Sequence, residues 1–266
     1  MSYRQTWYLL VDRTPKKGSW NMAVDEYLFQ QVKREPLTFL RFYAWIRPTA
    51  SLGFYQKTGR VINLEACREN QVDVVRRLTG GKLVLHHEEV TYSVASSETD
   101  VFSASLRESY RLISEALVLG LQKLGIQAEL ATSKPPEIYA RGNLPCFSFP
   151  AENEIEVKGK KLIGSAQKRE GNCFLQHGSI PLRNNTSLLE QITPNSNGGK
   201  VIRLISLEEA LGRGVEFNEV AAALICGFSE YFNAEIRPKI LSKEDREEIY
   251  RLEKEKYGTE EWTFQR

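Results

Sequence analysis

The chain has 266 residues, of which 41% are hydrophobic and 26% are charged. This balance is typical of a globular protein and excludes a disordered tail. The 36 basic and 34 acidic residues leave a formal net charge of +2, which argues against a general nucleic-acid-binding protein. We see no signal-peptide pattern and no run of roughly 20 apolar residues. We therefore expect a cytoplasmic protein that binds no membrane and keeps its thiols reduced.

Hydrophobic periodicity predicts alternating strands and helices in the first half of the chain. Strands are expected at residues 7–11, 37–43, 50–55, 72–76 and 90–95, and helices at 20–32, 64–70 and about 106–124. Ser19 and Asn63 precede the first two helices as N-cap residues. Ser105 and Glu108 form a capping box before the third helix, and Gly125 ends it.

The second half of the chain begins with a predicted antiparallel meander. Its strands are expected at residues 154–158, 161–168 and 172–182, joined by tight glycine turns. Short helices are expected to begin at Ser206 and Asn218, and a charged helix at Ser242. Because strands and helices do not alternate regularly, we predict an α+β fold with a mixed, largely antiparallel sheet flanked by helices. We expect a catalytic domain over 1–235 and a C-terminal helical extension over 236–266.

Four cysteines, at positions 67, 146, 173 and 226, show no CxxC or metal-ligand spacing. They are too few for a disulfide scaffold, and we predict no metal site. Cys146 follows a proline in a loop-like segment, where nucleophiles are common. Cys226 lies in an apolar helical pattern and is expected in the core. A thiol nucleophile also needs a group that stabilises the thiolate or accepts its proton. Lys161 or one of the three histidines would have to supply that group.

A second candidate site is the segment 76–87, which begins with two arginines. Gly80 and Gly81 would let the backbone approach a ligand closely. The arginines and Lys82 would suit a phosphate or a carboxylate. A glycine turn with solvated charges accounts for the pattern equally well, and a P-loop is excluded because GxxxxGK[S/T] is absent.

The predicted strand 161–168 contains small residues that leave room for a bulky group against the sheet. Alternation places Lys161 on the same face as Ile163 and Ser165, where partial desolvation would favour its neutral amine. A solvated lysine at a turn is the alternative. His177, in the next strand, fits a base, a donor that positions a ligand, or a core histidine with both nitrogens bonded.

Taken in order, these segments resemble the lipoate–biotin protein ligase superfamily. The resemblance is carried by Asn21-Met22-Ala23-x-Asp25-Glu26, Leu40-Arg41-Phe42-Tyr43-x-Trp45-x-x-Pro48-x-x-Ser51-Leu52-Gly53-x-x-Gln56, Arg76-Arg77-x-Thr79-Gly80-Gly81 through His86, Lys161-x-x-Gly164-Ser165-Ala166-Gln167 and Gln176-His177-Gly178-Ser179. It runs from about residue 7 to 183 and continues more weakly to the end of the chain.

The resemblance implies an acyl-binding pocket and a cysteine–lysine pair. The substrate-binding residues that it implies are Arg76, Arg77, Thr79, Gly80, Gly81, His86, Gly164, Ser165, Ala166, Gln167, His177 and Gly178. The pattern Cys146-Phe147-x-x-Pro150 is similar to that of octanoyltransferases that share the ligase-like sequence order. This implies transfer of an octanoyl group from octanoyl-acyl carrier protein, through a Cys146 thioester assisted by Lys161, to a lysine of a lipoyl domain or glycine cleavage H protein. No cofactor is implied, and we expect a monomer.

Three other functions stay open at this point. An ATP-dependent lipoate–protein ligase would need ATP and Mg²⁺, and a lipoyl or octanoyl amidotransferase would take its acyl group from another lipoyl-bearing protein. A non-catalytic acyl- or biotin-binding module would keep the pocket glycines alone. The sequence departs from the family pattern at Lys82, where a third glycine is common, and at His87, where an acid often follows the signature histidine.

Overall fold

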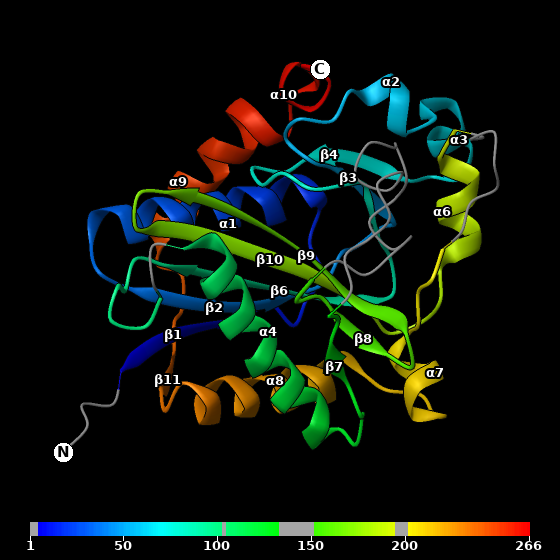
Figure 1. Cartoon of the computed structure of the whole chain (residues 1–266). Helices are drawn as coiled ribbons and strands as arrows, with labels where there is room; N and C mark the ends of the chain where they lie inside the picture. Colours follow the sequence, from blue (N-terminus) through cyan, green and yellow to red (C-terminus); the bar gives the residue numbers. More distant parts are fainter. Residues whose placement is uncertain (1–4, 103–104, 133–151, 195–201) are drawn as a thin grey trace.

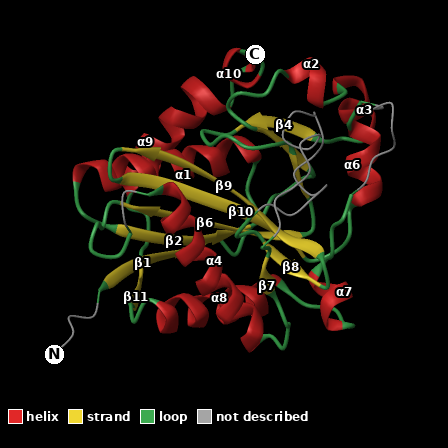
Figure 2. Ribbon diagram, in the orientation of Figure 1, coloured by secondary structure: helices red, strands yellow, loops and turns green. Residues whose placement is uncertain are grey.

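A computed structural model describes residues 5–102, 105–132, 152–194 and 202–266. Its strands form one large and one small sheet (Figures 1 and 2). The large sheet contains β1 (Thr6–Val11), β2 (Thr38–Tyr43), β6 (Glu89–Ser96), β7 (Glu129–Leu130), β8 (Ile155–Val157), β9 (Lys160–Glu170), β10 (Cys173–Pro181) and β11 (Glu235–Pro238). The small sheet contains β3 (Thr49–Leu52), β4 (Asp73–Arg76) and β5 (Val84–His86).

The large sheet is mixed, with the strand order β11-β1-β2-β6-β10-β9-β8-β7. Strand β1 pairs in parallel with β2 and β11, whereas the other neighbouring strands are antiparallel. The predicted meander is present as β8, β9 and β10, and the positive φ angles of Lys158 and Gly159 form its first turn. The predicted α+β class is therefore confirmed.

Helices lie on both faces of the large sheet, and others pack on the small sheet. They are α1 (Gly18–Arg34), α2 (Thr58–Val61), α3 (Leu64–Glu69), α4 (Leu106–Lys123), α6 (Thr186–Ile192), α7 (Leu207–Leu211), α8 (Phe217–Tyr231), α9 (Lys243–Leu252), the π-helix η2 (Glu253–Tyr257) and α10 (Glu260–Thr263). Asn63 caps α3 as predicted, and Ser105 accepts a hydrogen bond from the Glu108 amide. Ser206 and Ser242 each complete a capping box.

Three predicted element boundaries are wrong. The N-cap of α8 is Glu216, and the helix begins at Phe217 rather than at Asn218. Lys17, not Ser19, is the N-cap of α1, and the Ser19 hydroxyl donates to Glu253 Oε1 at 2.7 Å instead. The helix starts at Gly18, where a Cβ would lie 2.9 Å from side chains of both Thr49 and Val75, so close packing on the small sheet sets this end. Strand β3 ends at Leu52 rather than at residue 55, because the chain turns at Gly53.

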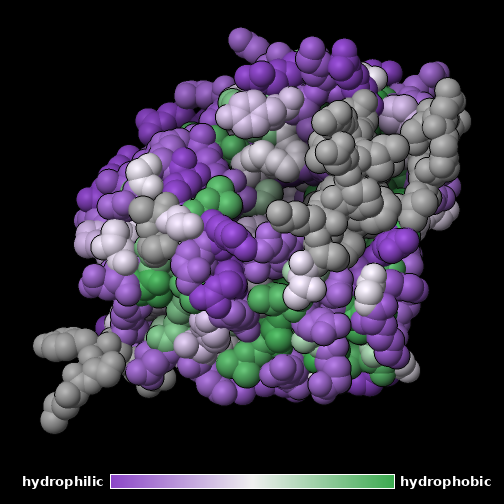
Figure 3. Space-filling model, in the orientation of Figure 1, coloured by the Kyte–Doolittle hydropathy of each residue, from purple (hydrophilic) through white to green (hydrophobic). Residues whose placement is uncertain are grey.

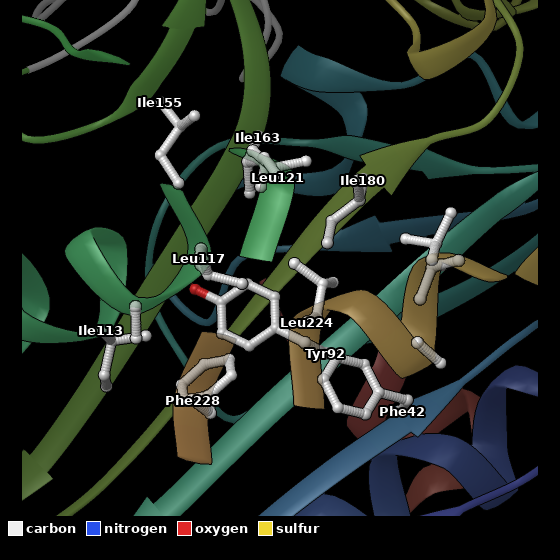
Figure 4. Close-up of a cluster of buried hydrophobic side chains, with 14 of the residues drawn as sticks. Phe42, Tyr92, Ile113, Leu117, Leu121, Ile155, Ile163, Ile180, Leu224 and Phe228 are labelled. Carbon is white, nitrogen blue, oxygen red and sulfur yellow. The ribbon is translucent and has the colours of Figure 1, made fainter. Parts of the chain in front are cut away.

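Helices α4 and α8 pack together on one face of the large sheet (Figure 1). A Cβ on Gly227 of α8 would lie 2.4 Å from the Gly120 nitrogen of α4, so the two helices touch at their backbones. Their apolar side chains meet those of β2 and β6, as Phe228 and Tyr92 do in Figure 4. The face in Figure 3 is mostly hydrophilic, with hydrophobic residues gathered near α4 and α8.

Helix α1 covers the opposite face, and α9 packs on α1 (Figure 1). The predicted boundary after residue 235 falls inside β11, and beyond it η2 and α10 contact α1 and β4. The predicted C-terminal extension is therefore in contact with the body of the fold over much of its length. In the described part of the chain, no helix is both long and apolar enough to cross a bilayer.

Candidate active site

A small cavity lies on the α1 face, between the large sheet and the small sheet. Its lining residues are Met22, Tyr43, Ser51, Arg77, Gly81, Lys82, Val84, His86, Thr91, Gly164, Ser165, Ala166, His177, Gly178 and Ser179. The two signature segments thus meet across one cavity, although about 80 residues of sequence separate them.

The structure brings most of the predicted binding residues to this cavity. Those that line it are Arg77, Gly81, His86, Gly164, Ser165, Ala166, His177 and Gly178. Thr79 and Gly80 do not line the cavity themselves, but each is hydrogen-bonded to a residue that does. The Thr79 hydroxyl contacts His177, and the Gly80 carbonyl accepts from Arg77.

Small residues allow close packing where β9 and β10 pass the cavity. A Cβ on Gly178 would lie 2.5 Å from both Ser165 Oγ and Tyr92 Cε1. On the opposite wall, Gly81 has a φ of +84°, and a Cβ there would lie 3.3 Å from the Cβ of Ala166. Larger side chains at Gly178 or Gly81 would therefore clash or strain the backbone.

A buried relay fixes the first wall of the cavity. His177 Nδ1 lies 2.9 Å from Asp25 Oδ2, and its Nε2 lies 2.7 Å from Thr79 Oγ1. Asp25 also accepts from Arg41 at 2.8 Å and from Tyr43 at 2.8 Å. This relay ties α1 to the large sheet and to the glycine segment of the small sheet.

The charges of the relay follow from its burial. Burial lowers the pKa of His177, and the hydrogen bond to Asp25 offsets this only in part. Burial would raise the pKa of Asp25, but the bond from His177 and the charge of Arg41 outweigh it and hold that pKa below its ordinary value. A neutral His177 donates from Nδ1 to the carboxylate and accepts the Thr79 hydroxyl at Nε2. Both nitrogens are thus engaged, which favours the core-histidine reading over a free base.

A second relay lies beside the first one. His86 Nε2 lies 2.8 Å from Ser51 Oγ, and His86 Nδ1 lies 2.8 Å from Glu89 Oε1. The His86 ring stacks on Trp45 with centroids 4.0 Å apart, and Glu89 also accepts from the Ser179 hydroxyl. Glu89, three residues after His86, thus supplies the carboxylate that contacts this ring.

Arg77 joins the two relays. Its guanidinium donates to Thr79 Oγ1 at 3.2 Å and to Ser51 Oγ at 3.0 Å. It also donates to the carbonyl of Gly80 at 2.8 Å and to that of Lys82 at 2.7 Å. Because a planar guanidinium spans several acceptors at fixed angles, Arg77 shapes the glycine segment around the cavity.

We predict that His177 makes the stability of the fold depend on pH just below neutrality. Because its pKa lies below the ordinary 6.5, the unfolded chain takes up the proton first as the pH falls. The stability that the neutral His177 contributes is fully present above pH 6.5, the ordinary pKa of a histidine. As the pH falls below 6.5, the free energy of unfolding decreases by up to about 1.4 kcal/mol per pH unit. Urea unfolding of wild type and His177→Asn, between pH about 7.5 and about 5.5, measures this slope.

His177→Asn keeps an amide donor for Asp25 but cannot take up the proton, so its stability should change less over that range. His87→Asn is the matched control, since the same exchange is made at a less buried histidine outside both relays. Parallel pH profiles for wild type and His177→Asn would contradict the prediction.

Lys161 is fully buried and pairs with a carboxylate that the sequence analysis missed. Its Nζ lies 2.7 Å from Glu154 Oε2, and Glu154 is itself buried. The backbone of Lys161 is fixed on both sides, since its amide donates to the Arg203 carbonyl and its carbonyl accepts from the Ile205 amide. The solvated-lysine alternative is therefore wrong. Lys161 is not among the residues that line the cavity between the two sheets.

Two other predicted residues also lie away from the cavity. Gln167 bonds to Gln176 and Ser109 on the α4 side of the sheet. Arg76 is buried in bonds to the turn after β3 and to α10. Neither side chain lines the cavity, so neither would contact a ligand bound there.

The predicted nucleophile, Cys146, lies outside the described residues. The other three cysteines are described. Cys67 is buried, Cys173 is half-buried, and Cys226 is exposed on α8. The expectation that Cys226 lies in the core is wrong, because the buried stripe of α8 runs through Leu224, Gly227 and Phe228 instead.

The relay acids and Glu154 gave only weak signals in the sequence. Asp25 and Ser51 stand in segments that carry the family resemblance, but nothing local shows that they contact histidines 152 and 35 residues away. A sign available for Glu89 is its place at the start of a strand with alternating apolar residues, where a buried carboxylate needs a partner.

Comparisons with known proteins agree with this geometry. A family model described as the lipoyl protein ligase A/B catalytic domain matches residues 17–229. The chain is 36% identical to octanoyltransferase LipM of Carboxydothermus hydrogenoformans, over 98% of this chain and 99% of that one. It is 39% identical to octanoyltransferase LipM of Kyrpidia tusciae, over 98% of this chain and 100% of that one.

A similar solved structure is that of a bipartite lipoate protein ligase from Thermoplasma acidophilum, described with its E2 lipoyl domain. It superposes with a TM-score of 0.80 at 24% identity, over 98% of this chain and 96% of that one. At this identity, the likeness shows the fold alone.

Proposed function

We propose that this chain, which belongs to the lipoyl protein ligase A/B catalytic-domain family, is an octanoyltransferase that acts in protein lipoylation. The observation that carries this function is similarity over nearly the full length of relatives named octanoyltransferase. These relatives confirm the predicted acyltransferase and do not favour the ligase, the amidotransferase or the non-catalytic module. A cytoplasmic location and a monomeric state stay predictions.

The cavity supports an uncharged acyl ligand. An octanoyl chain offers no charge, so it must be bound by apolar burial worth about 0.8 kcal/mol per methylene. Met22, Val84 and Ala166 supply apolar walls. The relay residues and Arg77, which form much of the polar part of the lining, are bonded to the protein itself. The lining can therefore face a hydrocarbon chain without leaving those groups unsatisfied.

In the first half of the proposed reaction, the Cys146 thiolate attacks the thioester carbonyl of octanoyl-acyl carrier protein. A new C–S bond forms to Cys146, the C–S bond to the carrier breaks, and the carrier thiolate leaves and takes up a proton. One thioester replaces another at nearly equal energy, so the proposal includes no ATP and no other cofactor. Lys161 favours the Cys146 thiolate through its positive charge.

In the second half, the amine of a lipoyl-domain lysine attacks the octanoyl-Cys146 thioester. A C–N bond forms, the C–S bond breaks, and the amine gives up a proton. The buried Lys161–Glu154 pair is proposed to pass this proton on as the sulfur leaves as a thiol. The amide is more stable than the thioester, and this difference drives transfer forward.

The test is a donor assay read by the intact mass of a lipoyl domain. With octanoyl-acyl carrier protein and no ATP, we expect octanoylation of the domain. The glycine cleavage H protein is the second acceptor to include. Modification only from free octanoate or lipoate, with ATP consumed and pyrophosphate released, would identify a ligase. Modification only from another lipoyl-bearing protein would identify an amidotransferase, and acyl binding without any transfer would identify a binding module.

A further inference from the structure

Arg76 connects the end of the chain to the turn that follows β3. The residue is fully buried, and its guanidinium donates to the carbonyls of Gly53 at 2.9 Å and Gln56 at 2.8 Å. Its Nη2 donates to Thr58 Oγ1 at 3.0 Å, and its Nε donates to the carbonyl of Thr263 at 2.9 Å. One side chain thus holds the β3 turn (residues 53–56) against α10.

The C-terminal tail (residues 253–266) holds the same region by further bonds. Trp262 Nε1 donates to the Arg76 carbonyl at 2.9 Å. The Arg266 carbonyl accepts from the amide of Thr58 at 2.9 Å and from its hydroxyl at 2.8 Å. The Trp262 ring also packs on Phe54, with centroids 5.9 Å apart. The tail therefore contacts Phe54 in the β3 turn, Thr58 just beyond the turn, and Arg76.

The β3 turn in turn supports the glycine loop (residues 79–82). The Phe54 amide donates to the Thr79 carbonyl at 2.9 Å. Gly53 touches the loop directly, since a Cβ there would lie 2.1 Å from the Gly81 carbonyl oxygen. Gly81 lines the cavity opposite Ala166. Contacts therefore run without a gap from the tail, through Arg76 and the turn, to the cavity wall.

The tail also holds the other wall of the cavity through α1. Tyr257 and Lys256 both donate to Glu26 Oε2. The neighbouring residue, Asp25, bonds to His177 in the relay. A segment that is far from the cavity in sequence is thus attached to both sides of it.

We propose that the C-terminal tail, anchored by Arg76, positions the glycine loop and so sets which acyl-chain length the cavity accepts. Arg76 is a positioning residue in this account, not the substrate-binding residue that the family resemblance implied. The proposal rests on the proposed acyl-transfer function. It assigns the C-terminal tail a role in specificity, although no tail residue lines the cavity.

Deletion of residues 259–266 removes the Thr263, Trp262 and Arg266 contacts together. The milder change Trp262→Phe removes only the indole N–H donor to Arg76 and keeps an aromatic ring near Phe54. We expect the deletion to reduce the preference for octanoyl over decanoyl donors by about tenfold, because a rigid pocket discriminates by at least that factor per methylene. We expect Trp262→Phe to shift the preference in the same direction by a smaller factor.

The ratio of rates with hexanoyl, octanoyl and decanoyl donors is the deciding readout. Partial unfolding lowers all three rates equally, so only a change in the pocket alters their ratio. Tyr27→Phe is the matched control, since it removes a bond between α1 and α9, to Asp245, that does not lead to the glycine loop. If both tail variants lost all three activities by one common factor, as Tyr27→Phe is expected to do, the proposal would be overturned.

Hydrogen exchange at the amides of residues 77–83 gives a readout that needs no activity. Faster exchange there in the deletion and in Trp262→Phe, but not in Tyr27→Phe, is expected if the tail supports the loop. Unchanged exchange would refute the link even if transfer were slower. A wild-type protein that transfers no acyl group from any donor would instead refute the proposed function, and the exchange measurement would still decide whether the tail holds the loop.

Discussion

Cys146→Ala is expected to reduce octanoyl transfer by about 10⁴-fold or more, because removal of a nucleophile abolishes the covalent route. The same variant should form no octanoyl adduct when it is incubated with octanoyl-acyl carrier protein. Wild type should gain the mass of one octanoyl group in that experiment. Intact-mass measurement before and after adding a lipoyl domain follows both half-reactions.

The other cysteines are poor substitutes, for reasons that the structure supplies. Burial raises the pKa of Cys67 to about 11, so its thiol is protonated near neutral pH. The Cys173 thiol lies 3.6 Å from the Val32 carbonyl, on the part of β10 that packs against α1. Cys226 is exposed on α8, which covers the face of the sheet opposite the cavity.

Cys226→Ala and Cys67→Ala are therefore the matched controls, one at an exposed and one at a buried thiol. Both should keep the octanoyl adduct and the transfer rate. Undiminished transfer by Cys146→Ala would refute the covalent mechanism, and loss of the adduct in Cys226→Ala would place the nucleophile on α8 instead.

The fold was predictable wherever local signals agree with tertiary packing. Ser206 and Ser242 begin helices because each side chain satisfies the first amides of its own helix. Ser19 has the same local chemistry, yet it bonds to Glu253 in the C-terminal tail. The start of α1 is decided by how closely Gly18 packs on the small sheet, which no local pattern records.

The residues of the candidate site likewise fall into those that the sequence located correctly and those that it did not. The family resemblance places Gly81, Ala166 and Gly178 correctly on one cavity, because their small size is itself the signal. It does not separate Arg76 from Arg77, although the two side chains point to different parts of the molecule. On a strand, neighbouring residues face opposite sides, and what lies on each side is set by distant segments such as α10.

Lys161→Met is expected to slow transfer by about 10²–10⁴-fold, the usual contribution of a group that moves a proton. It should also lower the free energy of unfolding by about 3–5 kcal/mol, because the buried Glu154 carboxylate loses its charged partner. Urea unfolding and single-turnover transfer measure the two effects separately.

The double variant Lys161→Met/Glu154→Gln separates the structural role of the pair from its chemical role. Removing both charges leaves no unpaired ion, so we expect most of the lost stability to return. Transfer should stay low, since neither side chain can then hold or pass on the proton. Recovery of transfer together with stability would show that Lys161 serves the fold alone.

A surface pair provides the control for this comparison. Lys123 Nζ on α4 lies 2.6 Å from Glu230 Oε2 on α8, and both side chains are more than a third exposed. Lys123→Met should leave both the free energy of unfolding and the transfer rate nearly unchanged, because water screens that pair. If the buried and exposed pairs instead behaved alike, burial would not be the cause of the Lys161 effect. The contrast between the two pairs therefore tests whether the low-dielectric surroundings of Lys161, and not merely its charge, make it suited to proton transfer.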